Sequence, residues 1–76
     1  MPTVYVLVLC DYSYSDHQTM RRISNLPYVI EVNRVDGPYD IIVKLYSDNM
    51  NAIDESIEKL VTEIHGIESA ITLTAE

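Results

Sequence analysis

The chain has 76 residues and one cysteine, and so short a chain buries only about 60% of its unfolded surface, with no disulfide or zinc-ligand spacing to help. Its composition, 47% hydrophobic and 22% charged, is typical of a folded globular domain, while its net charge of −7 argues against binding a nucleic-acid backbone. No apolar run approaches the ~18 residues of a membrane span and no signal peptide is evident, so we expect a cytoplasmic domain that gains stability from a partner chain.

The first third of the chain predicts a strand followed by a short helix. Residues 3–10 (TVYVLVLC) are β-branched, aromatic and aliphatic, which is typical of a buried strand. Ser15 and Gln18 fit a capping box, in which two side chains satisfy free backbone N–H groups at a helix start. The helix is expected to reach about Leu26 and to stop before Pro27, because proline disrupts a helix interior.

A β-hairpin is predicted next, from two apolar runs around a turn. Residues 29–35 (VIEVNRV) and 40–46 (DIIVKLY) have the composition of strands. Between them, Gly37 is free to take a positive φ and Pro38 fixes the following φ, so that residues 36–38 form a turn. Because the connection is short, the two strands are expected to pair with each other.

The last third of the chain predicts a longer helix and a short final strand. Residues 47–49 offer side chains for the N-cap of the helix, and Gly66 stands where a C-cap glycine belongs. Ile67 is expected to start the short final strand, which covers roughly residues 69–74. The apolar residues of the helix recur at helical spacing: Met50, Ile53, Ile57, Leu60, Val61 and Ile64.

The resulting β-α-β-β-α-β order predicts an α+β, ferredoxin-like fold, with a four-stranded antiparallel sheet and two helices on one face. Right-handed connections place the first and third strands in the centre of the sheet. Two helices cover one face only, yet the first strand is apolar on both, with Leu7 and Leu9 opposing Val6 and Val8. An open apolar face of this size exceeds what a monomer normally tolerates. We therefore expect a homodimer whose sheets face each other.

Residues 23–45 (ISNLPYVIEVNRVDGPYDIIVKL) resemble the effector domain of the Lrp/AsnC family of leucine- and asparagine-responsive regulators. The family carries a hydrophobic-x-x-Pro-x-Val run before its second strand, followed by a Gly-x-Tyr-Asp turn, which is residues 37–40 here. Residues 64–67 (IHGI) stand where the family usually has a hydrophobic-Pro-Gly-Val turn before a Thr-rich last strand, with His65 replacing the proline. The resemblance covers about four-fifths of the chain.

The resemblance implies a dimeric α/β barrel that pairs through its sheets and associates further into a tetramer or octamer. It also implies an amino-acid effector that binds between dimers and shifts their assembly. Family members usually carry an N-terminal helix-turn-helix, and none precedes Met1, so we expect residues 1–76 to be a single stand-alone ligand-binding domain. Such a domain would modulate transcription through hetero-oligomers with full-length Lrp/AsnC-type regulators, with no direct nucleic-acid contact and no membrane contact.

The candidate ligand-binding residues lie mainly in the turn and on the last strand, which the resemblance implies as the lining of the pocket. An amino acid needs donors for its carboxylate and an acceptor for its ammonium, and the turn offers backbone N–H groups and carboxylates. A purely structural interpretation competes at each position, as turn cap, helix cap or strand former. The candidate residues are Asp36, Gly37, Tyr39, Asp40, Asp48, Thr72 and Thr74.

The sequence shows no catalytic constellation, because His17 and His65 both lie at predicted helix ends and no activated nucleophile is suggested. We therefore expect no enzyme and no cofactor. We also expect no metal site, because Cys10, Asp11, Asp16 and His17 lack ligand spacing. Two alternatives stay open. One is a ligand-free assembly module that forms mixed oligomers with full-length regulators. The other is a dimeric α/β-barrel enzyme, which a deep pocket between sheet and helices would indicate.

Overall fold

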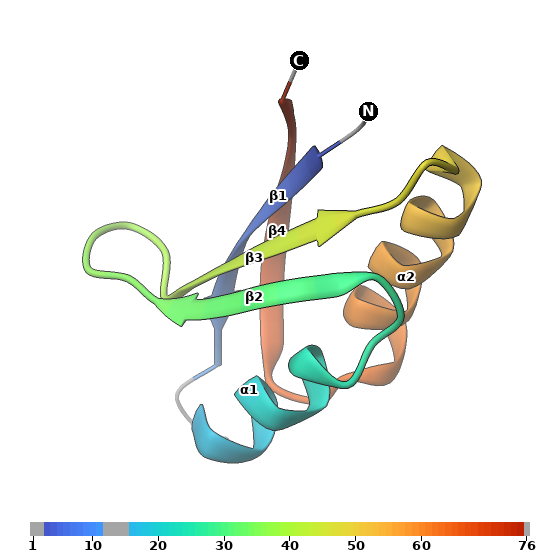
Figure 1. Cartoon of the computed structure of the whole chain (residues 1–76). Helices are drawn as coiled ribbons and strands as arrows, with labels where there is room; N and C mark the ends of the chain where they lie inside the picture. The colour runs from blue at the N-terminus through green and yellow to red at the C-terminus, as the bar shows by residue number, and fades with distance from the viewer. Residues whose placement is uncertain (1–2, 12–15, 76) are drawn as a thin grey trace.

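The computed structural model of the chain describes residues 3–11 and 16–75. These residues contain four strands and two helices in the predicted β-α-β-β-α-β order (Figure 1). The elements are β1 (Thr3–Cys10), α1 (Asp16–Ser24), β2 (Val29–Arg34), β3 (Ile41–Tyr46), α2 (Met50–Glu63) and β4 (Ile67–Ala75). Neither helix in this part of the chain is long and apolar enough to cross a membrane.

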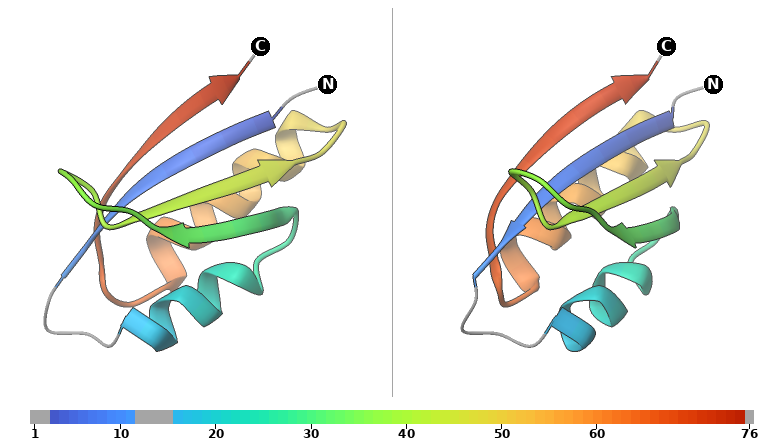
Figure 2. Two further views of the ribbon diagram at one scale, coloured as in Figure 1. Left: turned by 60° about the vertical axis from the view of Figure 1, so that its left-hand side comes forward. Right: turned by 90° about the vertical axis from the view of Figure 1, so that its left-hand side faces the viewer.

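The strands form an antiparallel sheet in the order β2-β3-β1-β4. Both helices lie on the same side of this sheet, as the two views of Figure 2 show. The predicted ferredoxin-like fold is therefore confirmed, including the central positions of β1 and β3. The two outer strands, β2 and β4, form the edges of the sheet.

The hydrophobic core lies between the sheet and the two helices. Alternate residues of β1 and β3 point into it, because successive side chains of a strand point to opposite faces. Ile23 of α1 and Ile53 and Leu60 of α2 close the core from the helix side, and none of the three has solvent contact. Each such side chain contributes about 1.5–3 kcal/mol through burial. The sheet contributes Val4, Val6, Val8, Cys10, Ile41, Val43 and Leu45.

The opposite face of the sheet, which no helix covers, is called the open face below. Strand register places Leu73 beside Tyr5 and Ile71 beside Leu7, so these side chains share that face. Ile71 and Leu73 are 43% and 49% exposed. The open face comprises Thr3, Tyr5, Leu7, Leu9, Glu31, Asn33, Ile42, Lys44, Tyr46, Ser69, Ile71, Leu73 and Ala75.

The end of α1 differs from the sequence prediction. The helix ends at Ser24, two residues before the expected Leu26. The N–H of Leu26 donates to the carbonyl of Ile23 at 3.1 Å, an i→i−3 bond that tightens the last turn ahead of Pro27. Ser15, the first residue of the predicted capping box, lies outside the described residues.

The final strand is longer than predicted. β4 begins at Ile67, the residue from which the final strand is expected to start, and Ile67 pairs with Cys10 beyond an irregularity in the register. It also continues to Ala75, which lies opposite Thr3. The full length of β1 is therefore paired on this side.

The start of α2 confirms the predicted N-cap, whereas its end does not use the predicted C-cap glycine. Asn49 is the N-cap, and its side-chain oxygen accepts a hydrogen bond from the N–H of Asn51 at 2.9 Å. The C-cap is Ile64, which has an extended backbone. Gly66 lies two residues beyond it and has a φ of 96°, in the left-handed region that glycine enters readily. The carbonyl of Gly66 accepts from the N–H of Asp11 at 2.8 Å, which fixes the start of β4 against the end of β1.

The buried side of α2 is not the simple apolar stripe that the sequence predicts. Met50 and Val61 belong to the predicted stripe but are exposed. Ser56 is buried instead, and its hydroxyl donates to the carbonyl of Pro27 at 2.6 Å. This bond joins the middle of α2 to the loop that leads into β2.

Candidate functional site

The turn between β2 and β3, residues 36–40, extends from one end of the sheet on the side away from the helices (Figures 1 and 2). It is closed by the N–H of Val35, which donates to the carbonyl of Asp40 at 3.0 Å. Gly37 has a φ of 132°, which an L-residue rarely adopts, so the turn requires glycine there. Asp36 and Gly37 are exposed, while Tyr39 is half-buried.

Asp40 has a structural role at the end of β1. Its Oδ2 accepts a hydrogen bond from the N–H of Cys10 at 2.9 Å, and its own N–H donates to the carbonyl of Val8 at 2.9 Å. These two bonds hold the turn against β1. A carboxylate that accepts a backbone N–H has one oxygen left for a ligand, so the structural and ligand-binding interpretations are compatible at this position.

The two threonines of the last strand lie away from the turn. Thr72 is opposite Val6 and Thr74 is opposite Val4, whereas the turn is bonded to Val8. Because Val6 and Val4 point toward the helices, the threonines share that face rather than the open face. Both threonines are nevertheless exposed, since they lie on an edge strand.

Asp48 lies in the loop after β3, at the end of the sheet opposite the turn. Ser47 takes part in ordering this loop, since its hydroxyl accepts from the N–H of Asn49 at 3.0 Å. Asn49, not Asp48, is the helix N-cap. Asp48 is exposed, so its carboxylate is accessible to a ligand or to another subunit.

The predicted site residues therefore form two groups at opposite ends of the sheet. Ile41, next to the turn, pairs with Val8, and Leu45, just before the Asp48 loop, pairs with Val4. Four residues of extended strand span about 13 Å. A single copy of the chain does not bring the turn together with Asp48 and Thr74.

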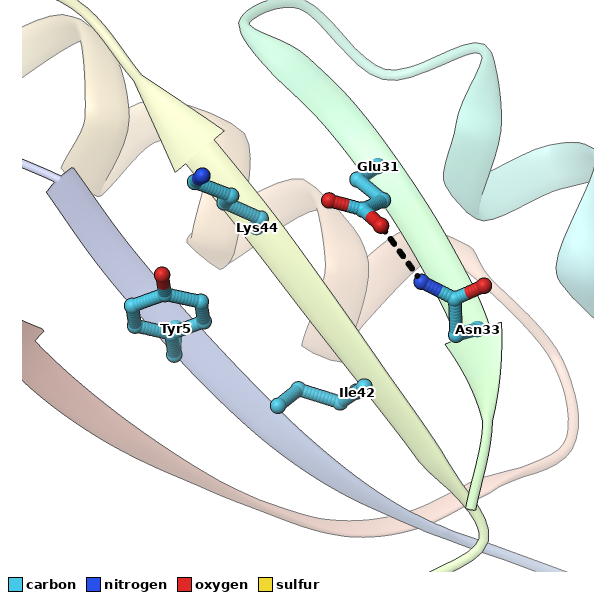
Figure 3. Close-up of a pocket in the computed structure, with 5 residues that line it drawn as sticks. All are labelled: Tyr5, Glu31, Asn33, Ile42 and Lys44. Atoms are coloured by element: carbon cyan, nitrogen blue, oxygen red, sulfur yellow. Dashed lines mark hydrogen bonds between the residues drawn. The ribbon is translucent and has the colours of Figure 1, made fainter.

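A pocket on the open face contains polar residues that the sequence analysis missed. Its volume is about 120 Å³ and it is lined by Tyr5, Glu31, Asn33, Ile42 and Lys44 (Figure 3). Glu31 lies opposite Lys44 and Asn33 lies opposite Ile42 on the neighbouring strand. The sequence does indicate part of this pocket. Glu31 and Asn33 are two residues apart in a predicted strand, so their side chains share a face.

The polar groups of this pocket are held in place by two contacts. The side-chain amide of Asn33 donates to Oε1 of Glu31 at 2.9 Å. The ammonium of Lys44 lies over the ring of Tyr5, 5.9 Å from its centroid, a distance at which a cation is attracted to the ring face. Both charges are thus available beside an apolar floor of Ile42 and Tyr5.

The remaining chemistry of the described residues is limited. Across residues 3–11 and 16–75, no three His, Cys, Asp or Glu side chains gather where they could hold a metal ion. Cys10, whose N–H is bonded to Asp40, is buried on the helix-facing side of β1. The side chain of Asp16, one member of the group considered from the sequence, lies outside the described part.

Two comparisons with known proteins show what the chain is similar to. A homocitrate synthase of Sulfurisphaera tokodaii is 31% identical over 67 residues, which is 88% of this chain. The chain spans 14% of the length of that curated relative. Among solved structures, a protein of Thermus thermophilus has a TM-score of 0.88 and 28% identity, over all of this chain and 94% of the other.

A third likeness concerns the fold, and a family match defines the family. A transcriptional regulator of Neisseria meningitidis, solved in complex with L-Met, has a TM-score of 0.78 over 99% of this chain and 49% of the other. At 16% identity this likeness shows the fold alone. Residues 3–75, nearly the whole sequence, match the model of the Lrp/AsnC ligand binding domain. The chain therefore belongs to the Lrp/AsnC ligand binding domain family.

Proposed function

We propose that this regulatory domain senses a free amino acid and changes its assembly with other subunits in response. The match of residues 3–75 to the Lrp/AsnC ligand binding domain is the observation that carries the proposal. The complex of the Neisseria meningitidis regulator with L-Met supports an amino acid as the class of effector. The net charge of −7 supports a role without direct contact to nucleic acid.

The assembly unit in this proposal is a homodimer whose open faces are in contact. Ile71 and Leu73 expose nearly half of their surface on that face, next to Leu7 and Tyr5. A second copy is the natural cover, because a two-fold assembly uses the same patch on both subunits. The turn at residues 36–40 extends on the same side as the open face, so it is placed to reach such a partner (Figure 2).

The proposed effector site lies between copies of the chain. The turn and the Asp48–Thr74 group lie at opposite ends of one sheet, as the strand register requires. In a symmetrical assembly whose copies run in opposite directions, the turn of one copy lies near the Thr74 end of another. Asp36 and Asp40 would then accept hydrogen bonds from the effector ammonium, while backbone N–H groups near Gly37 would donate to its carboxylate.

The output in this proposal is a change of assembly and not a chemical reaction. An effector shifts an equilibrium between assemblies only by its differential affinity for them. A tetramer, an octamer or a mixed oligomer with a full-length Lrp/AsnC-type regulator would pass this change on to transcription in the cytoplasm. In this scheme residues 1–76 act as a stand-alone domain without catalytic activity.

Control of an enzyme is the second candidate function. The observation that favours it is the 31% identity to one segment of a homocitrate synthase, a protein much longer than this chain. In that case the effector-bound chain would change the rate of a partner enzyme. Adding the purified chain to such a synthase, with and without the effector, tests this directly through the rate of the enzyme.

A thermal-shift screen against the twenty amino acids tests the sensing proposal. The protein concentration is kept fixed, because oligomers melt in a concentration-dependent way. A ligand at about one hundred times its Kd adds roughly 2.7 kcal/mol, which moves the midpoint of a domain of this size by more than ~4 °C. A shift from one or a few amino acids supports sensing. No shift from any of them contradicts sensing and favours the ligand-free assembly module.

Two variants then test whether the effector binds at the turn. Asp40→Asn keeps an oxygen that can accept from the N–H of Cys10 but removes the charge, and Asp36→Ala removes an exposed carboxylate. We expect both to keep the melting temperature of the unliganded protein and to reduce the effector-induced shift by more than half. Asp54→Asn, on the exposed side of α2, is the matched control and should respond as the unaltered protein does.

A further inference from the structure

The two edge strands of the sheet differ in how far they resist pairing with another chain. β2 is six residues long, and a shift in its register with β3 leaves Ile30 as a bulge. It also carries the charged residues Glu31 and Arg34. β4 is nine residues long, and after an irregularity at its start it runs regularly over residues 69–75 without charge, proline or glycine. Bulges and charges commonly protect an edge strand, so the β4 edge is the less protected one.

The helix layer does not reach the outer side of β4. Ala70 and Thr72 lie opposite Val8 and Val6 and therefore point toward the helices. The two valines have no solvent contact, whereas Ala70 is half-buried and Thr72 is exposed. A strip along β4 is therefore open to solvent on the helix side, beyond the cover that α2 provides.

An exposed flank of α2 borders this strip. Met50, Ile57 and Val61 are spaced at i, i+7 and i+11, which returns to one side of a helix. Met50 is 39% exposed and Val61 is 47% exposed. Both lie about 120–140° around the helix axis from Ser56, which is bonded to Pro27 in the loop after α1. Because α1 contacts β2 and α2 contacts β4, this flank faces the β4 edge.

The charges around the flank have one sign. Glu58, one turn before Val61, and Glu68, at the start of β4, are both exposed. Of the five Lys and Arg residues in the chain, four lie on α1, β2 and β3. The fifth, Lys59, lies about 160–180° around α2 from the flank. A second copy of β4 would add Glu68 and no cation, so a basic partner complements this edge better than another copy does.

We propose that the β4 edge and the α2 flank together bind an extended segment of another protein, with lysine or arginine at alternate positions. The segment adds to β4 as a further strand through backbone hydrogen bonds. Its alternate side chains point to the helix side, where their aliphatic stems pack against Met50 and Val61 and their charged ends reach Glu58. The added strand lies beside β4 and not over it, so a second copy on the open face leaves room for it. The inference goes beyond the proposed function and does not depend on amino-acid sensing.

The probe is a peptide of about seven residues, as long as the regular part of β4, that alternates lysine with valine and has blocked ends. It is titrated into the folded chain and followed by the NMR chemical shifts of backbone amides. We expect saturable shifts in residues 69–75 and none in residues 29–34, on the other edge. The same peptide methylated on its central backbone nitrogens keeps every charge but cannot donate, so it should bind at least about tenfold more weakly. Equal binding of the methylated peptide would show charge attraction alone and overturn strand addition.

Two pairs of variants test the named contacts. Val61→Lys puts a like charge against the peptide and should weaken binding by about tenfold or more, whereas Asn51→Lys adds the same charge outside the flank. Glu58→Gln should weaken binding by about two- to fivefold, as expected for an exposed ion pair, and Glu55→Gln is its matched control. Because all four positions are exposed, circular dichroism should show an unchanged fold for each variant.

The remaining outcomes separate this proposal from its alternatives. Equal weakening by Val61→Lys and Asn51→Lys, or a peptide of alternating glutamate and valine that binds as well as the lysine peptide, would overturn it. A loss of self-association in Val61→Lys without any peptide would assign the β4 edge to a second copy and overturn it as well. None of these results changes the outcome of the thermal-shift screen, which tests amino-acid sensing separately.

Discussion

The two faces of β1 have similar apolar content and opposite environments. On the helix-facing side, Val4, Val6 and Val8 have no solvent contact. On the open face, Leu73 and Ile71 expose nearly half of their surface beside the same central strand. The apolar character of a strand therefore does not say which of its faces is already buried within one chain. The face that lacks a cover is the one that points to an interaction.

The largest expected difference between the two faces is in folding stability. Leu60→Ala removes a fully buried side chain under the sheet and should lower the free energy of unfolding by about 2–5 kcal/mol. Leu73→Ala makes the same change on the open face and should cost under about 1 kcal/mol in dilute protein. Urea titrations of both variants at low protein concentration measure the two values. Equal losses would mean that the open face already belongs to the core of one chain.

A smaller loss of folding stability is expected when a buried hydroxyl of α2 is removed. Ser56→Ala removes a buried hydrogen bond of 2.6 Å and leaves the Pro27 carbonyl without that donor, which should cost about 1–3 kcal/mol. Thr62→Ala removes a bond of similar length to the carbonyl of Glu58, but Thr62 is exposed, so the cost should stay within about 0.5 kcal/mol. Thermal unfolding of the two variants would contradict this account if Thr62→Ala were the more damaging.

The turn beside the open face requires glycine at position 37 for its backbone conformation and not for space. A Cβ added at Gly37 would meet no atom within 4 Å, yet the φ of 132° is strained for any L-residue. We expect Gly37→Ala to lower the free energy of unfolding by about 1–2 kcal/mol. Asp36→Ala next to it carries no such strain and is the control. An unchanged stability of Gly37→Ala, measured by urea titration, would mean that the turn adopts another conformation.

The sequence predicted the fold because several local signals agreed. The strand composition of residues 3–10, the turn at Gly37-Pro38 and the helix ends near Asn49 and Gly66 each indicate the same β-α-β-β-α-β order. Element ends were less predictable, because they depend on pairing between distant residues. β4 continues to Ala75 since that residue finds a partner in Thr3.

The candidate site was only partly predictable. The turn was identified through its motif, but the bond from the Cys10 N–H to Asp40 joins residues 30 positions apart and follows only from strand register. The separation of Thr74 from the turn follows from the same register. The pocket of Glu31 and Lys44 was missed because neither strand is unusual alone. It arises where two neighbouring strands bring opposite charges to one face.

The central claim is that the open face is an interface between copies of the chain. The most direct test compares the association states of two variants at neighbouring positions of β4. Leu73 points to the open face and Thr74 points to the other side, and both are exposed. Sedimentation equilibrium should show a dimer or larger assembly for the unaltered chain and for Thr74→Asp. It should show a folded monomer for Leu73→Asp, because assembly would bury the new carboxylate in the interface without a positive charge to pair with. An unaltered chain that sediments as a monomer, or a Leu73→Asp variant that assembles as well as Thr74→Asp, would contradict the account.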